Sequence, residues 1–359
     1  FSSSDLLKTL DSLQSNDCYT QLEVHVIDNS CDASESLLLQ HLAQKKGFIL
    51  HLAETNLGFG RACNQLYAAT QSPYVFLINP DAYLLNGALD KLLAALEENN
   101  HLAASGPKIF WSAQQQFILP RSISFSPLSF FLNHYQNSFA KRILWFNSLL
   151  FRKKSIQHWQ AQQPLQQQNL SGGSVLLRRS AVEKAGGLFD PDFFMYFEDS
   201  DLFKRLVEQG QQLVYIPDAQ IVHQFSGCAR DQQLEKNEFM AQSSEVFFNK
   251  YYAGNKLITW GKSSSAKPSQ SLWQAEIIEL GHLNSASEVF IQLPKTARYL
   301  VEWSPCNFFL PAAGLMLHGK TFQFPTDIWP ILPSGHHYLR IAPVKDFWVK
   351  PKIWHWIIP

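Results

Sequence analysis

Hydrophobic positions in the first third of the chain alternate between helical and strand spacing. Leu6, Leu7, Leu10 and Leu13 recur at helical intervals, and the apolar run at 22–28 that follows is typical of a buried strand. The alternation continues, with helices expected at 36–45 and 60–70 and strands at 48–53 and 74–78. It predicts right-handed crossovers and a mostly parallel sheet with helices on both faces. Ligands of such sheets bind at the carboxyl ends of the strands.

The segment 122–168 has a different composition. It mixes Phe, Leu, Trp, Ser and Gln with basic residues and contains no acid. The basic residues are Lys141, Arg142, Arg152, Lys153 and Lys154. We predict a helical insertion with two open interpretations. It is either a hairpin that packs on the core and exposes its basic side chains to water, or a surface that contacts lipid head groups.

The region after residue 260 loses the helical spacing. Residues 261–271 are mostly small and polar and include one proline, which is typical of a linker between an α/β domain at 1–260 and a second domain. Short β-type runs follow, and we predict a small antiparallel β-sandwich over 272–359. This region is rich in tryptophan, which either packs in its core or exposes faces that stack on sugar rings.

Composition narrows the classes of function. Thirty Lys plus Arg balance thirty Asp plus Glu, so the overall charge does not indicate a nucleic-acid partner. The apolar runs are too short for a helix that spans a bilayer. The five cysteines are scattered, odd in number and without a CxxC pair, which favours a reducing, cytoplasmic compartment over a disulfide framework.

Polar residues follow the first two predicted strands. Asp28 comes directly after one strand, where a carboxylate can hydrogen-bond a ligand or form an Asx turn that caps the next helix. Asn56 precedes a glycine-containing turn, and Arg61 and Asn64 lie on the helix that follows. Glycines allow close backbone approach and a helix N-terminus favours phosphate, although a capped turn explains the same pattern.

Two further positions have the chemistry of a cation site. Asn79 and Asp81 follow a buried strand in an Asn-Pro-Asp sequence that is also an ordinary turn former. A carboxylate at the end of a central strand is well placed to hold a divalent cation. His223 ends another strand run, and it would add a nitrogen ligand if it is not simply structural.

An acidic cluster lies at 190–201, next to several aromatic residues. The leucines that follow and the stop at Gly210 predict a helix that begins near Asp199, so the acids lie at its positive end. Capping and an Asp201–Arg205 pair explain some of these acids but not all. An acid flanked by aromatic side chains in a cleft is suited to act as a general base.

Five motifs in this order resemble the family 2 inverting glycosyltransferases, in the rhamnosyltransferase-like and galactofuranosyltransferase-like branch. They are VIDNSCDAS, ETNLGFGRACNQ, FLINPDAYL, the run from NLSGGSVLLRRS to FEDSDLFKRLVEQG, and YIPDAQIVH, and they extend over roughly 1–252. The resemblance implies an α/β nucleotide-diphospho-sugar transferase fold, of the glycosyltransferase A type, with one continuous central sheet.

The resemblance also implies roles for individual residues. Asp199 matches the general base, while Glu198, Asp201 and Tyr196 would shape the acceptor pocket. Asp81 and His223 would hold Mg²⁺ or Mn²⁺. The remaining donor contacts would be Asp28, Asn56, Arg61, Asn64, Asn79, Gly172 and Gly173.

The sequence departs from this pattern in two places. The family opens with an apolar strand that ends in an aromatic residue and Asn, whereas this sequence starts at Phe1, after the place of that strand. Either the strand lies upstream of Phe1 or the protein lacks it, and its absence would weaken donor binding. Asn79 replaces an acid that many members carry, so fewer protein ligands would hold the metal. The C-terminal region lies outside the common core.

We therefore expect an inverting glycosyltransferase that moves a sugar from a nucleotide-sugar donor to a saccharide or lipid-linked acceptor in surface polysaccharide synthesis. It would be cytoplasmic, with peripheral contact at the inner face of the membrane. The alternative is a carbohydrate-binding protein whose transferase domain is inactive and whose Trp-rich domain binds the sugar.

Overall fold

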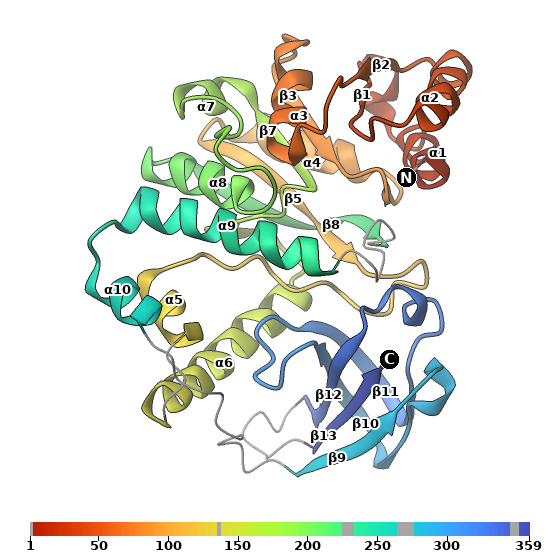
Figure 1. Cartoon of the computed structure of the whole chain (residues 1–359). Helices are drawn as coiled ribbons and strands as arrows, with labels where there is room; N and C mark the ends of the chain where they lie inside the picture. Colours follow the sequence, from red (N-terminus) through yellow and green to blue (C-terminus); the bar gives the residue numbers. More distant parts are fainter. Residues whose placement is uncertain (1–2, 135–137, 225–232, 264–275, 345–351) are drawn as a thin grey trace.

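The computed structural model describes residues 3–134, 138–224, 233–263, 276–344 and 352–359. An α/β body contains the residues up to α10, and a separate β-sheet forms the C-terminal part (Figure 1). The α/β fold class is therefore confirmed. The arrangement of strands differs from the prediction in both parts.

The N-terminal elements follow the predicted alternation. A two-stranded parallel sheet pairs β1 (His25–Asp28) with β2 (Ile49–Leu52). The helix between them is capped at both ends, because Asp32 accepts from the amides of Ser34 and Glu35 and Gly47 adopts the left-handed conformation at φ 78°. The helical elements of this region are α1 (Ser3–Leu13), the 3₁₀ turn η1 (Asp17–Gln21), α2 (Ala33–Lys46) and α3 (Gly58–Ala68).

A six-stranded sheet forms the centre of the body, in the order β3-β7-β5-β8-β4, with β6 paired to β8. Its strands are β3 (Tyr74–Ile78), β4 (Ala82–Leu84), β5 (Leu102–Phe110), β6 (Leu165–Gln167), β7 (Ser174–Arg178) and β8 (Gln212–His223). Among its described pairings, only β5 with β8 is parallel. The prediction of a mostly parallel sheet was therefore wrong, because hydrophobic spacing predicts burial but not strand direction.

The predicted single continuous sheet is divided in two. A cavity of about 380 Å³ separates β1 from β3, and its walls include residues 21–25 on one side and 72–79 on the other. It lies between the edges of β1 and β3 that no described strand covers.

Helices cover the central sheet (Figure 1). The predicted helix at the acidic cluster is α8, which has a strongly one-sided apolar face and buries Leu202, Phe203 and Leu206. The predicted insertion is helical and contains α5 and α6, followed by β6. The side chains of Lys141 and Arg142 lie outside the described residues. The remaining helices are α4 (Ala88–Glu98), α5 (Pro127–His134), α6 (Ser138–Trp159), α7 (Arg179–Lys184), α8 (Glu198–Glu208), α9 (Gln233–Tyr252) and α10 (Lys256–Ser263).

The C-terminal part is one five-stranded mixed sheet, in the order β11-β10-β12-β13-β9. Its strands are β9 (Ile277–His282), β10 (Phe290–Ser304), β11 (Ala313–Gln323), β12 (Gly335–Pro343) and β13 (Lys352–Ile358). Because β13 and β9 pair in parallel, the sheet is not purely antiparallel, and it does not form the predicted sandwich. The first residues of the predicted linker, 261–263, belong to α10, and residues 264–271 lie outside the described part.

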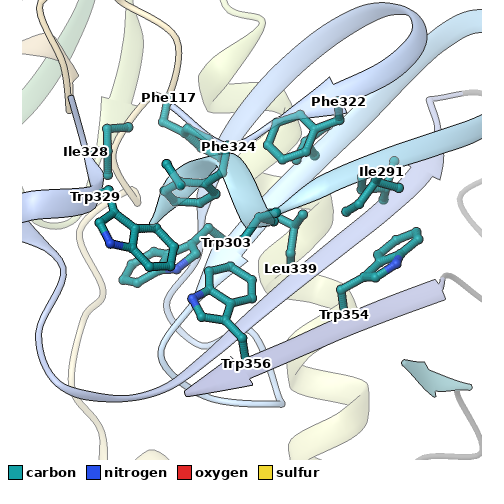
Figure 2. Close-up of a cluster of buried hydrophobic side chains, with 14 of the residues drawn as sticks. Phe117, Ile291, Trp303, Phe322, Phe324, Ile328, Trp329, Leu339, Trp354 and Trp356 are labelled. Carbon is teal, nitrogen blue, oxygen red and sulfur yellow. The ribbon is translucent and has the colours of Figure 1, made fainter. Parts of the chain in front are cut away.

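Tryptophans form much of the core of this sheet. Trp303, Trp329, Trp354 and Trp356 are all less than a tenth exposed and lie among other apolar side chains (Figure 2). Trp329 and Trp356 stack with their ring centroids 6.3 Å apart. The core-packing interpretation is therefore confirmed for these four residues, and their faces are not available to a sugar. Trp273 and Trp348 lie outside the described residues.

The two parts share a core. Phe117, from the segment after β5, is fully buried in the cluster of the C-terminal sheet, and the ring of Trp111 packs at a tilt against Trp303 with centroids 4.5 Å apart. The backbone of Ile118 pairs with Gly314 of β11. The segment 111–119 of the α/β body therefore contributes to the core of the C-terminal sheet.

Candidate active site

Asp81 and His223 lie side by side at the end of the central sheet. Asp81 follows the turn after β3, and β4 then pairs with β8 so that Ala82 lies opposite His223. This register brings Asp81 Oδ1 within 3.0 Å of His223 Nε2. Both side chains are mostly buried, and Asn79 Nδ2 lies 3.4 Å from the same imidazole nitrogen. The structure thus brings His223 to the two predicted residues of the turn after β3, from which it is far apart in the sequence.

Two glycines join this group to the acidic helix. The amide of Asn79 donates to the carbonyl of Gly173, and a Cβ added to Gly173 would lie 2.8 Å from Asn79 Nδ2. A Cβ on Gly172 would lie 2.7 Å from Cβ of Asp199. Both positions therefore exclude side chains, and the glycine pair connects Asn79 to Asp199.

Asp199 lies in the first turn of α8 and contacts the glycine pair. Its Oδ2 accepts from the amide of Gly172 at 3.2 Å, and its Oδ1 accepts from the amide of Ser200 at 2.6 Å. Burial raises the pKa of Asp199, and these hydrogen bonds offset part of the increase. A carboxylate that is held in place with a raised pKa has the properties of a general base.

The backbone before α8 adopts an unusual conformation. Tyr196 and Phe197 have φ values of 70° and 66°, in the left-handed region that bulky residues rarely adopt. Such strain costs on the order of 1–3 kcal/mol per residue and is concentrated at functional sites. Here the strained turn leads directly into Glu198 and Asp199.

Glu198 lies against α3. It is 6% exposed, and its Cβ is 3.7 Å from the position of a Cβ on Gly60. Burial, together with the neighbouring charge of Asp199, raises the pKa of Glu198 to about 8. Its contribution to an acceptor pocket stays a prediction.

Asp201 belongs to a buried ion network. Its Oδ2 accepts from Arg205 Nε at 2.8 Å, and its Oδ1 accepts from Lys250 Nζ and the Tyr251 hydroxyl, both at 2.6 Å. Lys250 also pairs with Asp190 at 2.5 Å. These contacts hold α9 against α8, and this structural role accounts for the buried carboxylate of Asp201. They give no support to the predicted contact of Asp201 with an acceptor.

Asp28 is engaged by its own loop. Its carboxylate accepts from the amide and hydroxyl of Ser30, at 2.9 and 2.6 Å, and from the hydroxyl of Ser36 at 2.5 Å. Burial alone would raise the pKa of Asp28, but these hydrogen bonds hold it below the usual value. An Asx turn is therefore present at Asp28, but the predicted cap of the next helix is wrong, because the N-cap of α2 is Asp32. Contact with a nucleotide base stays a prediction.

The remaining donor residues shape the loops around the site. Asn56 Oδ1 accepts from Asn29 Nδ2 at 3.1 Å and so joins the loop after β1 to the loop after β2. Asn64 exchanges two hydrogen bonds with the backbone of Phe189, and Arg61 Nε donates to Pro191 O. Both side chains fix α3 against the loop at 189–191. Their predicted phosphate contacts are untested.

A second polar pocket borders the glycine pair. Ser171 and Ser174, on either side of the pair, line it together with Arg121, His158 and Tyr215. The sequence analysis did not single out these last three residues, because they come from separate segments and only Tyr215 lies in a motif, as the first residue of YIPDAQIVH. That position, on the strand that leads to His223, was the one available signal.

Asp81 and His223 could provide two ligands for a divalent cation, which is fewer than such a cation needs. An imidazole nitrogen and a carboxylate oxygen, 3.0 Å apart, are donors that Mn²⁺ accepts, and the carboxylate also suits Mg²⁺. Among the residues that the structure describes, no group of three or more His, Cys, Asp and Glu could hold a metal ion. A cation bound here would therefore take most of its ligands from a bound substrate or water.

Comparison with known proteins gives a family. A family model described as glycosyl transferase family 2 matches residues 2–184. The N-acetylglucosaminyl-diphospho-decaprenol L-rhamnosyltransferase of Mycobacterium tuberculosis is 31% identical over 186 residues, which cover 47% of this chain and 56% of the relative. The same protein from a second strain matches equally. The chain thus spans little more than half the length of these curated relatives.

Solved structures resemble the chain more distantly. GalNAc-T7 with UDP, GalNAc and Mn²⁺ has a TM-score of 0.45 and 12% identity, over 61% of this chain and 41% of that one. The mannosyltransferase PcManGT from Pyrobaculum calidifontis, in complex with GDP-Man and Mn²⁺, has a TM-score of 0.43 and 15% identity, over 68% and 61%. Likeness at this level carries no argument about function.

Proposed function

The chain belongs to glycosyl transferase family 2, and from this premise we propose that it transfers a sugar from a nucleoside-diphosphate donor to an acceptor hydroxyl, with inversion at C1. The observation that carries the proposal is the glycine pair, which holds Asn79 beside the Asp81–His223 pair on one side and Asp199 on the other. A group that receives a leaving diphosphate and a group that receives a proton must flank a sugar in this way.

Asp81 and His223 would hold the cation on the donor side. A divalent cation supplies Lewis-acid stabilisation of the negative charge that develops on the leaving diphosphate. The two residues share a mostly buried position, where electrostatic interactions are stronger than in water. Asn79 lies close enough to orient the imidazole of His223.

Asp199 would take the proton of the acceptor hydroxyl. The amide of Gly172 fixes Oδ2, and the amide of Ser200 fixes Oδ1, so the carboxylate has one orientation. As the hydroxyl oxygen attacks C1 from the face opposite the leaving group, its proton moves to Asp199. The bond to the new acceptor forms while the bond to the nucleoside diphosphate breaks, which inverts the configuration.

For the substrates, we propose a dTDP-, UDP- or GDP-linked sugar and a lipid-linked saccharide acceptor. The support is the mycobacterial relative, whose name states a rhamnosyl donor group and a diphospho-decaprenol acceptor. We also propose residues 1–260 as the catalytic unit and 272–359 as an accessory domain. The alternative of a purely carbohydrate-binding protein is less well supported, because the four described tryptophans of that domain are buried.

Replacing Asp81 by alanine tests the donor site. A nucleoside diphosphate at 100 times its Kd should stabilise the wild type by about 2.7 kcal/mol, and in the variant we expect this Mn²⁺-dependent gain to disappear. The measurement is a thermal-shift panel of dTDP, UDP and GDP with and without Mn²⁺. Asp218→Ala, which removes an exposed carboxylate from the same strand as His223, is the control and should behave as wild type. An unchanged shift in Asp81→Ala would contradict the assignment.

The insertion offers a surface for membrane contact. Phe146 and Leu150 are 55% and 45% exposed, four residues apart on α6, and the exposed Lys153 and Lys154 continue the same face. Leu128 of α5 and Trp260 of α10 are also exposed, and Figure 1 shows these two helices next to each other. Within the described residues, no helix has the length and apolar character to cross a membrane. Apolar side chains flanked by lysines suit the surface of an anionic bilayer.

We therefore expect the double variant Phe146→Ser, Leu150→Ser to bind phosphatidylglycerol vesicles on the order of 10-fold more weakly than wild type, because it loses apolar area that enters the interface. Vesicle sedimentation measures this. Leu37→Ser, Leu38→Ser removes two leucines of similar exposure from α2 and should leave binding unchanged. Equal loss in both double variants would rule out a specific role for α6.

A further inference from the structure

The polar pocket beside the glycine pair contains buried groups that the proposed mechanism does not use. Its volume is about 40 Å³, and its walls come from β5, β8, the end of α6 and the segments around 120 and 170. Among its described lining residues, none carries a carboxylate, whereas Arg121 contributes a guanidinium and His158 an imidazole. The pocket is large enough for a small polar group.

Three of these groups lack hydrogen-bond partners within the described protein. Tyr215 is 1% exposed, and its buried hydroxyl makes no hydrogen bond. Arg121 Nε and His158 Nδ1 are also buried without a partner. Buried polar groups normally have partners, because leaving one unpaired costs free energy. A guanidinium N–H, a phenol and an imidazole around one small pocket therefore point to a ligand that accepts hydrogen bonds.

The electrostatics favour an anion. Arginine keeps its charge even though burial lowers the pKa of Arg121. Burial, together with the positive charges of Arg121 and Lys108, lowers the pKa of His158 to about 3, so this imidazole is neutral at physiological pH. The ring of His158 lies over that of Tyr215, with centroids 3.8 Å apart. The pocket thus carries positive charge and neutral hydrogen-bonding groups.

The pocket adjoins both the proposed general base and helix α6. Ser171 lines it, and the next residue, Gly172, donates its amide to Asp199. Asn169, another lining residue, donates to Ile123 O at 2.9 Å and holds the segment that carries Arg121. On the other side, His158 lies on α6, the helix with the exposed apolar face. The pocket therefore adjoins both the segment that positions the general base and the helix that carries the proposed membrane surface.

We propose that this pocket binds a phosphate group of the acceptor and so selects lipid-linked saccharides that carry a phosphate next to the sugar. The inference rests on the proposed function, because it takes Asp199 as the base that faces the acceptor. Arg121 is the main ligand, since charge-assisted hydrogen bonds from arginine to phosphate are short and strong. Tyr215 adds a neutral donor. His158 positions the phenol by stacking.

Binding of inorganic pyrophosphate in the presence of EDTA tests the pocket without the donor-side cation. Isothermal titration of the full chain should give Arg121→Gln a Kd about 10-fold to 100-fold higher than wild type, because a charge-assisted hydrogen bond is lost. Tyr215→Phe should weaken binding by a smaller factor without loss of thermal stability, since its hydroxyl has no protein partner to lose. Lys184→Gln, the same change of charge at an exposed site on α7, should bind as wild type. Equal Kd values for Arg121→Gln and Lys184→Gln would overturn the proposal.

Steady-state kinetics with two acceptors then show whether the pocket binds a phosphate of the acceptor or a phosphate of the donor. The two substrates are an alkyl-diphosphate-linked saccharide and the neutral alkyl glycoside of the same saccharide. Arg121→Gln should raise KM about 10-fold to 100-fold for the first only, with kcat and the KM of the nucleotide sugar unchanged. An equal rise for both acceptors, or a rise in the donor KM, would overturn the acceptor assignment. If the wild type transfers sugar to neither acceptor, the proposed function fails, while the pyrophosphate titration still decides whether the pocket binds phosphate.

Discussion

Replacing Asp199 by asparagine is expected to lower kcat by about 10²-fold to 10⁴-fold, because the amide cannot accept the acceptor proton and general-base assistance contributes a factor of this size. Nucleoside-diphosphate binding should persist, since Asp199 is separated from the Asp81–His223 pair by the glycine loop. The fold should also persist, because an asparagine Oδ1 can still accept from one of the two amides that fix the carboxylate.

The pH dependence of the wild type gives a second measure of the same residue. Burial raises the pKa of Asp199, and a base works only when it is deprotonated, so kcat should rise with pH through that pKa. The rising limb should disappear in Asp199→Asn. Steady-state kinetics across pH 4–8 would measure both variants.

Asp192→Asn is the matched control, because it makes the same substitution at an exposed acid in the same cluster. It should keep wild-type kcat and the wild-type pH profile. Near-normal turnover in Asp199→Asn would contradict the assignment of Asp199 as the general base.

The second large effect concerns stability at the junction of α6 with the C-terminal sheet. Replacing Glu302 by glutamine is expected to lower the free energy of unfolding by about 3–5 kcal/mol. Glu302 is 1% exposed and lies between two arginines, with Arg152 Nε at 2.8 Å and Arg340 Nη2 at 2.6 Å. The variant would remove the buried carboxylate charge that the two guanidiniums share. Urea denaturation measures the change as a shift in midpoint at constant slope.

The effect should depend on pH in a defined direction. Burial alone would raise the pKa of Glu302, but Arg340 and Arg152 outweigh it and hold the pKa below its ordinary value. A depressed folded-state pKa gives stability that is present above the unfolded value, near 4.3, and is lost as the pH falls through the folded value. The difference between wild type and Glu302→Gln should therefore narrow below about pH 4.

Glu183→Gln provides the comparison at the surface. Glu183 is 56% exposed and lies 3.6 Å from Arg179, so its loss should cost only about 0–1 kcal/mol. Equal midpoints for Glu302→Gln and wild type would show that the buried ion cluster does not stabilise the junction.

Local patterns predicted most of the elements and the key polar positions. The Leu6–Leu13 spacing, the strand at Tyr74–Ile78 and the helix that begins near Asp199 all appear as expected. Asp81 and His223 could be paired only through the family resemblance, because 141 residues lie between them and the β4–β8 register that joins them has no local signal.

Strand direction and side-chain partners could not be predicted. Hydrophobic spacing does not say whether β7 pairs in parallel with β5, or that β9 pairs in parallel with β13. Asp201 was grouped with Asp199 because they are neighbours in sequence, but a separation of two residues, just over half a helical turn, directs it to Lys250 and Tyr251 of α9. Arg121 and Tyr215 line one pocket only in the folded chain, so the motif that contains Tyr215 could not indicate its place beside Arg121.

The most direct test of the central claim is the release of nucleoside diphosphate from dTDP-, UDP- and GDP-sugars in the presence of a lipid-diphosphate-linked saccharide. We expect Mn²⁺-dependent release from one donor by the wild type, loss of release in Asp199→Asn, and a product of inverted configuration at C1. No release from any donor, or equal release by wild type and Asp199→Asn, would contradict a transferase that uses Asp199 as its base.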